Sequence, residues 1–330
     1  MKIALDAMGG DHAPTVTVEG GIWAARDFNV TVVLVGPEER IREEMAKHNT
    51  QGASIEIVHA PEWIRMDEHP ATSVRAKPRN TMSVALEMVK QGEVDAFVTC
   101  GHTGAALAAS LFTLGRIRGI KRPALTTVFP ALHGSFLILD IGANADCKPE
   151  YLRQFAMMGS VYAEHVFGIR HPKVGILSIG EEGGKGNALV QDTYPLLEEA
   201  LGERFIGNVE PKEALRGDVD VVVTDGFTGN IFVKTAEAVA DMLMRVMKEE
   251  IKRRPLAVAG ALLAKPAFKA TGERLDPREY GGAPLLGVDG IVIVGHGRSD
   301  AYAVRNAVRM GIRAVDGDIV RRIREGLTNL

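Results

Sequence analysis

The feature that most constrains the fold is an alternation of short apolar runs with longer helical patterns along all 330 residues. Short runs rich in β-branched and aliphatic residues are typical of strands buried on both faces. The predicted strands are 2–6, 31–36, 54–60, 94–100, 124–130, 136–142, 173–180, 219–225 and 290–296. The predicted helices are about 15–27, 38–48, 81–91, 103–115, 149–168, 187–202, 228–252 and 300–326. This order predicts an α/β fold, a three-layer αβα arrangement with a mostly parallel sheet.

Composition limits the class of protein further. Lys plus Arg number 39 and Asp plus Glu 42, so the net charge of −3 lacks the basic excess of a nucleic-acid binder. Two cysteines are too few for a disulfide framework, which favours a reducing cytoplasm. The short apolar run at the N-terminus predicts a first strand rather than a signal peptide, and no run is long enough to span a membrane. Because no linker, repeat or low-complexity tract is evident, we expect one compact domain over 1–330; two lobes divided near residue 150 are the alternative.

Glycine-rich turns follow six of the predicted strands. They are 6–14, 99–105, 140–150, 178–187, 224–230 and 295–301. In parallel α/β sheets ligands bind beyond the carboxyl ends of the strands, and a helix N-terminus there can hold an anion. Each turn alone could merely cap a helix. Since all six are expected at one edge of the sheet, together they predict a shared anion site.

Known motifs fit these turns poorly. GHGRSD (295–300) lacks the last glycine of a dinucleotide fingerprint, and GEEGGKGN (180–187) lacks the spacing and the Ser/Thr of a Walker motif. The chain has no C-x-x-C, H-E-x-x-H or G-x-S-x-G, so zinc catalysis and an esterase elbow are not supported. The glycines around Lys185 could still present N–H groups to an anion, or the segment could be a flexible loop with a solvated lysine. Cys147 is interpreted as a small hydrophobe because no base is paired with it.

Histidines and a basic run add further candidates. His12, His102 and His296 each lie in one of the turns, so at least one could perform acid–base work. The segment VRAKPRN (74–80) carries three cations just before a predicted helix. It is a second possible contact for an anion or a partner, or simply a solvated charge run.

A series of segments, in order along the whole chain, resembles one known family, the bacterial phosphate acyltransferases of the PlsX type. The segments are LDAMGGDHAP (5–14), RPAL (122–125), DIGANADCKPEYLRQFAMMGSVYA (140–163), GEEGGKGN (180–187), FIGNVE (205–210), TDGFTGN (224–230), EYGGAPLLG (279–287) and HGRSDA (296–301). The resemblance implies transfer of a long-chain acyl group from acyl carrier protein to inorganic phosphate, giving acyl phosphate for phospholipid synthesis. It also implies a fold similar to the isocitrate and isopropylmalate dehydrogenases, a homodimer without metal or other cofactor, and a cytoplasmic location at the inner face of the membrane.

Two departures from the family pattern matter. CGHTGA (100–105) has His102 where the family usually has Asn, which puts any role of residue 102 in doubt. KPRNTM (77–82) replaces the usual K-K-x-S-S-M, but Asn80 and Thr81 can still cap the following helix.

The implied chemistry needs positioning more than a strong base. Phosphate is already an anionic nucleophile and a thiolate is a good leaving group, so the protein must place phosphate and stabilise the oxyanion. The predicted catalytic residues are Lys185, Asn230, Asp225 and His12. The predicted substrate-binding residues are Asp6, Gly9, Gly10, Asp11, His102, Thr103, Gly104, Asn144, Lys148, Gly186, Asn187, Gly229 and Lys234. The residues around Asp6 are expected to close the same pocket as those around Lys185, and no metal ligand is predicted.

An apolar stretch between cations, KRRPLAVAGALLAKPAFK (252–269), lies within a helical region expected to project over 245–275. Burial of the apolar side chains and attraction of the cations to anionic lipid would both favour binding to a membrane surface. The predicted membrane contacts are therefore Leu256, Val258, Leu262 and Leu263. A helical hairpin buried in a dimer and a dock for the acidic carrier protein are the alternatives.

Two other functions are alternatives for such a chain. A dehydrogenase on the related fold would need dinucleotide contacts, which the motifs do not supply. A scaffold that only binds the carrier protein would keep the 252–269 segment but would not need six glycine-rich turns.

Overall fold

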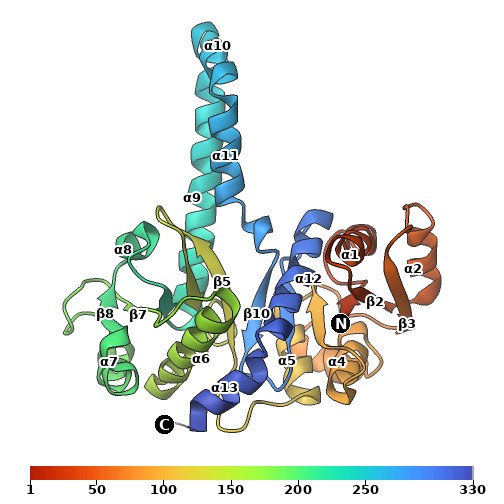
Figure 1. Ribbon diagram of the computed structural model, residues 1–330, viewed down its shortest axis with the longest axis horizontal. Helices are drawn as coiled ribbons and strands as arrows, with labels where there is room; N and C mark the ends of the chain where they lie inside the picture. The colour runs from red at the N-terminus through yellow and green to blue at the C-terminus, as the bar shows by residue number, and fades with distance from the viewer. Residues whose placement is uncertain (329–330) are drawn as a thin grey trace.

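The apolar runs form one continuous eleven-stranded sheet in the computed structural model, which describes residues 1–328. The strands lie in the order β3-β2-β1-β4-β11-β10-β5-β6-β9-β7-β8 (Figure 1). Their bounds are β1 Lys2–Asp6, β2 Thr31–Gly36, β3 Ser54–His59, β4 Ala96–Thr99, β5 Ala124–Pro130, β6 Ser135–Leu139, β7 Val174–Leu177, β8 Phe205–Val209, β9 Val221–Val223, β10 Gly282–Leu286 and β11 Val292–Gly295.

Helices cover both faces of the sheet, as the sequence predicted. The helices are α1 Thr15–Phe28, α2 Glu38–Met45, α3 Pro70–Ala76, α4 Thr81–Gln91, α5 Thr103–Thr113, α6 Pro149–Phe167, α7 Ala188–Leu201, α8 Pro211–Arg216, α9 Gly226–Lys252, α10 Pro255–Leu263, α11 Lys265–Leu275, α12 Ala301–Asp316 and α13 Ile319–Thr328, with short 3-10 turns at Gly202–Arg204 and Pro277–Glu279. Along β1, Ile3 and Leu5 pack in the core that α1, α6, α7, α12 and α13 cover. Ala4, between them, packs with α4 and α5 on the other face, so the three-layer αβα prediction is confirmed.

Three antiparallel ladders at the centre of the sheet reverse its direction. β10 runs antiparallel to both β11 and β5, and β5 runs antiparallel to β6. The remaining ladders are parallel, so the sheet is mostly parallel as predicted. As a consequence, β1, β2, β3, β4 and β11 run one way, whereas β6, β7, β8 and β9 run the other.

The sequence prediction missed two strands and the short helices α3 and α8, and it merged two other helices. β8 (FIGNV) and β10 (GAPLL) contain Gly, Asn or Pro, which weaken the strand signal. The predicted helix 300–326 is in fact α12 and α13, separated at Gly317 and at Asp318, whose φ of 48° lies in the left-handed region.

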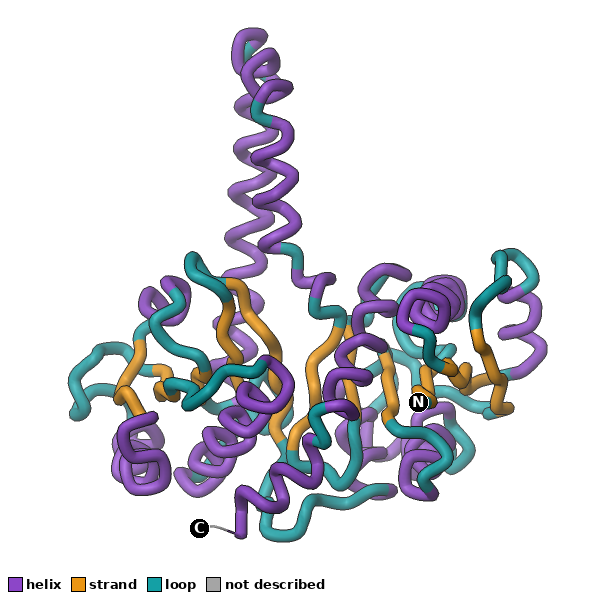
Figure 2. The backbone as a smooth tube through the Cα atoms, viewed as in Figure 1, coloured by secondary structure: helices purple, strands orange, loops and turns teal. Residues whose placement is uncertain are grey.

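A helical projection extends from the sheet, made of the outer part of α9 with α10 and α11 (Figures 1 and 2). We call residues 237–275 the arm. None of its residues is buried. Arg274 at its base donates hydrogen bonds to the carbonyls of Ala131 and Leu132 in the β5–β6 turn. No helix within residues 1–328 is long and apolar enough to cross a membrane.

Candidate active site

Strand direction divides the six glycine-rich turns into two groups. The first group, 6–14, 99–105 and 295–301, follows β1, β4 and β11, which are mutually parallel. The second group, 140–150, 178–187 and 224–230, follows β6, β7 and β9, which are also parallel to one another. Because three antiparallel steps separate β11 from β6, the two groups leave the sheet at opposite strand ends. The prediction that all six turns lie at one edge is therefore wrong.

The first group is organised around Asp6 at the end of β1. Asp6 is 1% exposed; its carboxylate accepts hydrogen bonds from Thr99 Oγ1 at 2.8 Å and from the N–H of Met8 at 3.1 Å. Burial raises the pKa of the Asp6 carboxyl, while these donors and Thr81 oppose the rise. A Cβ at Gly9 would lie 2.6 Å from Asp6 Oδ2, so only glycine fits there.

Backbone contacts hold the rest of the first group together. The N–H of Asp11 donates to the carbonyl of Gly297 at 2.7 Å, and Gly10 has a φ of 112°. His102 Nδ1 accepts from the N–H of Gly104 at 3.1 Å and so caps α5, while Thr103 at the start of the helix is exposed. His12 is exposed. No hydrogen bond or ion pair between residues 1 and 328 joins this group to the second one.

The second group is organised around Asp140, just after β6. This buried carboxylate accepts from the N–H groups of Leu125, Gly142, Ala143 and Asn144 and from the Asn144 amide. The same amide also donates to the carbonyl of Pro123 at 2.7 Å. Asn144, predicted to bind substrate, therefore has its amide engaged in fixing the turn. Burial raises the pKa of Asp140, and the surrounding donors oppose the rise.

The start of α9 packs directly on the Asp140 turn. Asp225 caps the helix: its carboxylate accepts from the N–H of Thr228 at 2.8 Å and from its hydroxyl at 2.8 Å. A Cβ at Gly229 would lie only 2.0 Å from the carbonyl oxygen of Asp140. Asn230 donates one amide hydrogen to the carbonyl of Ile141 at 2.8 Å, which leaves its second N–H available.

The glycine-rich loop after β7 completes the second group. Gly186 has a φ of 105°, in the left-handed region that favours glycine. Asn187 caps α7, its Oδ1 accepting from the N–H of Val190 at 3.0 Å. Lys185 is exposed between them.

Charge distinguishes the two groups more sharply than geometry does. Lys148, Lys185 and Lys234 are exposed in or just beyond the second group, and none has an ion-pair partner in the described part of the chain. The N-termini of α6, α7 and α9 start at the same turns. The first group holds no lysine and one arginine, Arg298. Cations and helix N-termini both favour an anion, so the second group is the candidate anion site.

A twelve-residue repeat underlies both groups. VDAFVTCGHTGA (94–105) and VDVVVTDGFTGN (219–230) share Val, Asp, Val, Thr, Gly, Thr and Gly at matching positions. Asp95 exchanges hydrogen bonds with Lys2 at 2.7 and 2.8 Å, as Asp220 does with Lys173 at 2.8 and 3.0 Å. The sequence analysis found no repeat; direct alignment of these two strand-turn segments would have revealed it.

The two thiols are not poised for nucleophilic attack. Burial raises the pKa of Cys147 to about 12 and that of Cys100 to about 12. A thiol that stays protonated at neutral pH is a poor nucleophile, which agrees with the interpretation of Cys147 as a small hydrophobe.

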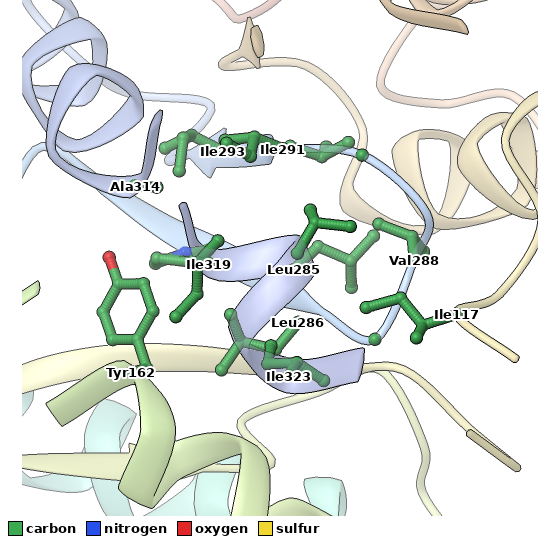
Figure 3. Close-up of a pocket in the computed structure, with 15 residues that line it drawn as sticks. Ile117, Tyr162, Leu285, Leu286, Val288, Ile291, Ile293, Ala314, Ile319 and Ile323 are labelled. Atoms are coloured by element: carbon green, nitrogen blue, oxygen red, sulfur yellow. The ribbon is translucent and has the colours of Figure 1, made fainter. Parts of the chain in front are cut away.

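An acidic cluster and a small apolar cavity also stand out among the described residues. The carboxylates of Glu181, Glu210 and Glu213 lie close together, but Lys212 Nζ pairs with all three at 3.1, 2.6 and 3.5 Å. An apolar cavity of about 10 Å³ lies among β10, β11 and α13, where Tyr162, Leu286 and Ile323 approach one another (Figure 3). It contains none of the predicted site residues and is a packing void in the core.

Solved structures with the same fold include several acyl-transferring enzymes. A phosphotransacetylase from Streptococcus pyogenes superposes with a TM-score of 0.64 at 16% identity, covering 97% of this chain and 94% of that one. The EutD phosphotransacetylase from Staphylococcus aureus gives a TM-score of 0.60 at 19% identity, covering 96% and 94%. A 4-hydroxythreonine-4-phosphate dehydrogenase from Burkholderia phymatum gives 0.50 at 16% identity, covering 99% and 97%. The architecture is thus the one that phosphotransacylases share with dehydrogenases.

Sequence relatives define the chain more closely. A family model described as "Fatty acid synthesis protein" matches residues 1–322. The phosphate acyltransferase of Thermus thermophilus is 52% identical over 330 residues, covering 100% of this chain and 99% of the relative. That of Dictyoglomus turgidum is 50% identical over 331 residues, covering 100% and 98%. The chain belongs to the phosphate acyltransferase family, as its motifs predicted, and is an acyltransferase.

Proposed function

We propose that this enzyme transfers a long-chain acyl group from acyl carrier protein to inorganic phosphate, and that the second group of turns binds the phosphate. The observation that carries the assignment is that α6, α7 and α9 begin at turns of the second group, which have three exposed lysines in or just beyond them. These are Lys148, Lys185 and Lys234, all without ion-pair partners among the described residues. Lysine side chains and helix N-termini both favour a bound anion.

The reaction then needs few further groups. A phosphate oxygen attacks the thioester carbonyl carbon; the new C–O bond forms, the C–S bond breaks, and the electron pair leaves with the carrier thiolate. Lys185 and the N–H groups of its loop hold the nucleophile, and the free amide hydrogen of Asn230 is placed to stabilise the oxyanion. Asp225 holds the start of α9 through its cap. The first group, including His12, leaves the sheet at the opposite strand ends and has no part in this step.

Steady-state turnover of palmitoyl–acyl carrier protein tests this assignment, with acyl phosphate trapped as the hydroxamate. Removing one charged donor to a transition state costs about 100-fold or more in rate, so Lys185→Ala should lose about that much while remaining folded. Lys90→Ala, an exposed lysine on α4 without an ion pair in the described chain, is the matched control. Turnover by Lys185→Ala at the wild-type rate would refute the phosphate assignment.

We propose that the tip of the arm makes a peripheral membrane contact. Leu256 is 90% exposed, Leu263 86%, Leu262 69% and Val258 40%, with Lys252 and Lys265 beside them. Exposed apolar side chains next to cations suit an anionic bilayer surface. The double substitution of Leu262 and Leu263 by Glu should abolish sedimentation with anionic vesicles, whereas Leu215→Glu on α8 should not. Undiminished sedimentation of the double variant would argue for a carrier-protein dock or a dimer contact at the tip.

The apolar side of α9 nearer the sheet supports a homodimer. Val239, Met242, Leu243 and Val246 are each between 44% and 59% exposed there. A long helix stripe of this kind is usually covered by another helix, and a second copy of the arm would cover it. Residues 1–330 would then act as one domain, with 245–275 as its contact region, in the cytoplasm at the inner face of the membrane. Light scattering of the purified protein should give the mass of two chains.

A further inference from the structure

The FIGNVE segment (205–210) has no part in the site described above, yet one of its side chains reaches the glycine-rich loop. Asn208, in β8, is 5% exposed. Its Nδ2 donates to the carbonyl of Glu182 at 2.7 Å and to the carbonyl of Lys185 at 3.3 Å. The amide therefore binds the loop on both sides of its paired glycines.

A β-bulge places this side chain where it can do so. β7 and β8 pair in register at Val174 and Phe205, but Ile176 is opposite Asn208, so β8 carries one extra residue. Gly207, within the bulge, has a φ of 90°. A shift of one residue moves a strand side chain to the other face of the sheet. Without the bulge Gly207 would be opposite Ile176, and Asn208 would face away from the core that Ile176 shares with α7.

A second amide binds two further carbonyls of the loop. Gln191 Nε2, on the first turns of α7, donates to the carbonyls of Gly184 at 3.1 Å and Gly186 at 3.0 Å. Together the two amides bind four of the five carbonyls from Glu182 to Gly186, all except that of Gly183. The N–H groups of Gly183, Gly184, Gly186 and Asn187 have no acceptor between residues 1 and 328. Donors without partners in such a loop are free for an anion.

The hydrogen bonding of the Asn208 side chain indicates more than a role in stability. Its Oδ1 is buried and has no hydrogen-bond partner among the described residues. A buried acceptor without a donor costs free energy, so a purely structural site would favour an apolar side chain or a satisfied amide. Both hydrogen bonds of the Asn208 side chain are therefore donated by its Nδ2, and both go to carbonyls of the glycine-rich loop.

We propose that Asn208 and Gln191 are positioning residues for the phosphate step. A glycine-rich loop can rotate its peptide planes at little cost, and a carbonyl turned toward the phosphate would repel it. By holding the carbonyls, the two amides keep the loop N–H groups presented to the anion. This inference rests on the proposed function, because it assumes that the loop of Lys185 binds phosphate.

Kinetics with phosphate as the varied substrate test the inference in the full-length enzyme. Gln191→Met removes the donor from an exposed side chain, and Asn208→Ala removes it from the buried one. Losing such hydrogen bonds should raise the KM for phosphate about five- to tenfold, with kcat and the KM for the acyl donor changed less than about twofold. Gln91→Met is the matched control, because its amide bonds only to Glu87. Trypsin should also cut after Lys185 faster in both variants, and phosphate should protect the wild-type loop.

The outcomes separate the inference from the function on which it rests. If Lys185→Ala loses turnover but both amide variants keep the wild-type KM for phosphate and the wild-type rate of tryptic cleavage, the positioning role is refuted and the phosphate site stands. If wild-type turnover does not depend on phosphate, the proposed function fails and the inference fails with it. Should Asn208→Ala not fold, Gln191→Met decides alone, since its side chain is exposed.

Discussion

The two groups of turns share one backbone design but carry different side chains. Both place a V-T-x-G-x-T-G segment after a parallel strand, anchored by an aspartate that bonds the neighbouring strand. The first group closes around Asp6 and contains no lysine, whereas three lysines without partners in the described chain lie in or just beyond the second group. The comparison shows that the framework supplies helix N-termini twice, and that the side chains added to it determine which copy suits phosphate.

The matching glycines Gly104 and Gly229 test how tightly each copy is built. A Cβ at Gly229 would meet the backbone oxygen of Asp140 at 2.0 Å, but one at Gly104 would meet Pro70 Cγ at 2.9 Å. Gly229→Ala should therefore lower the free energy of unfolding by about 3 kcal/mol, and Gly104→Ala by about 1 kcal/mol or less, because alanine also favours the helix. Urea unfolding followed by circular dichroism measures both. Equal losses would show that the two copies tolerate a side chain alike.

The helix caps differ less between the copies. Asp225→Ala removes the acceptor for the N–H of Thr228 and should cost about 1 kcal/mol of unfolding free energy. His102→Asn replaces an imidazole cap with a preferred one, so the unfolding free energy should change by less than about 0.5 kcal/mol. The same unfolding measurement applies, and a large loss in His102→Asn would mean that the imidazole has a contact beyond its cap.

The smallest expected difference between the two groups of turns is in the reactivity of their cysteines, Cys100 in the first group and Cys147 in the second. Both thiols have a pKa raised to about 12, so at pH 8 alkylation by iodoacetamide should be far slower than for free cysteine. Its rate should rise as pH increases toward 12, because the thiolate fraction grows. Cys147 should react faster than the fully buried Cys100, since part of it is exposed. Mass spectrometry of timed samples gives both rates, and rapid modification of Cys147 at pH 8 would contradict the burial argument.

The pattern of apolar residues predicted most strands and helices, because a strand or helix depends mainly on residues that are neighbours in the chain. Every predicted strand overlaps an observed one, and Asn80 caps α4 as expected. The direction of the sheet could not be predicted in the same way. It is reversed by the tight β5–β6 hairpin and by β10, whose Gly and Pro hide a strand that pairs with partners far away in sequence. Prediction of one shared edge failed for this reason.

The site residues were predictable as types but not as arrangements. Glycine and lysine spacing identified the loop around Lys185, yet the amides that hold it come from α7 and from a bulged strand. Neither Gln191 nor Asn208 carries a local signal, because a bulge is visible only in the pairing of β7 with β8.

Helix α9 connects the second group of turns with the outer part of the arm. It begins at the Asp225 turn and continues for 27 residues without Gly or Pro beyond Gly229, a length of about 40 Å. An uninterrupted helix has no hinge, so it acts as a rigid spacer. With its tip at a bilayer, the spacer would fix the height of the phosphate site above the lipid. Lengthening α9 by one turn would raise that height and rotate the tip, without altering any residue of the site.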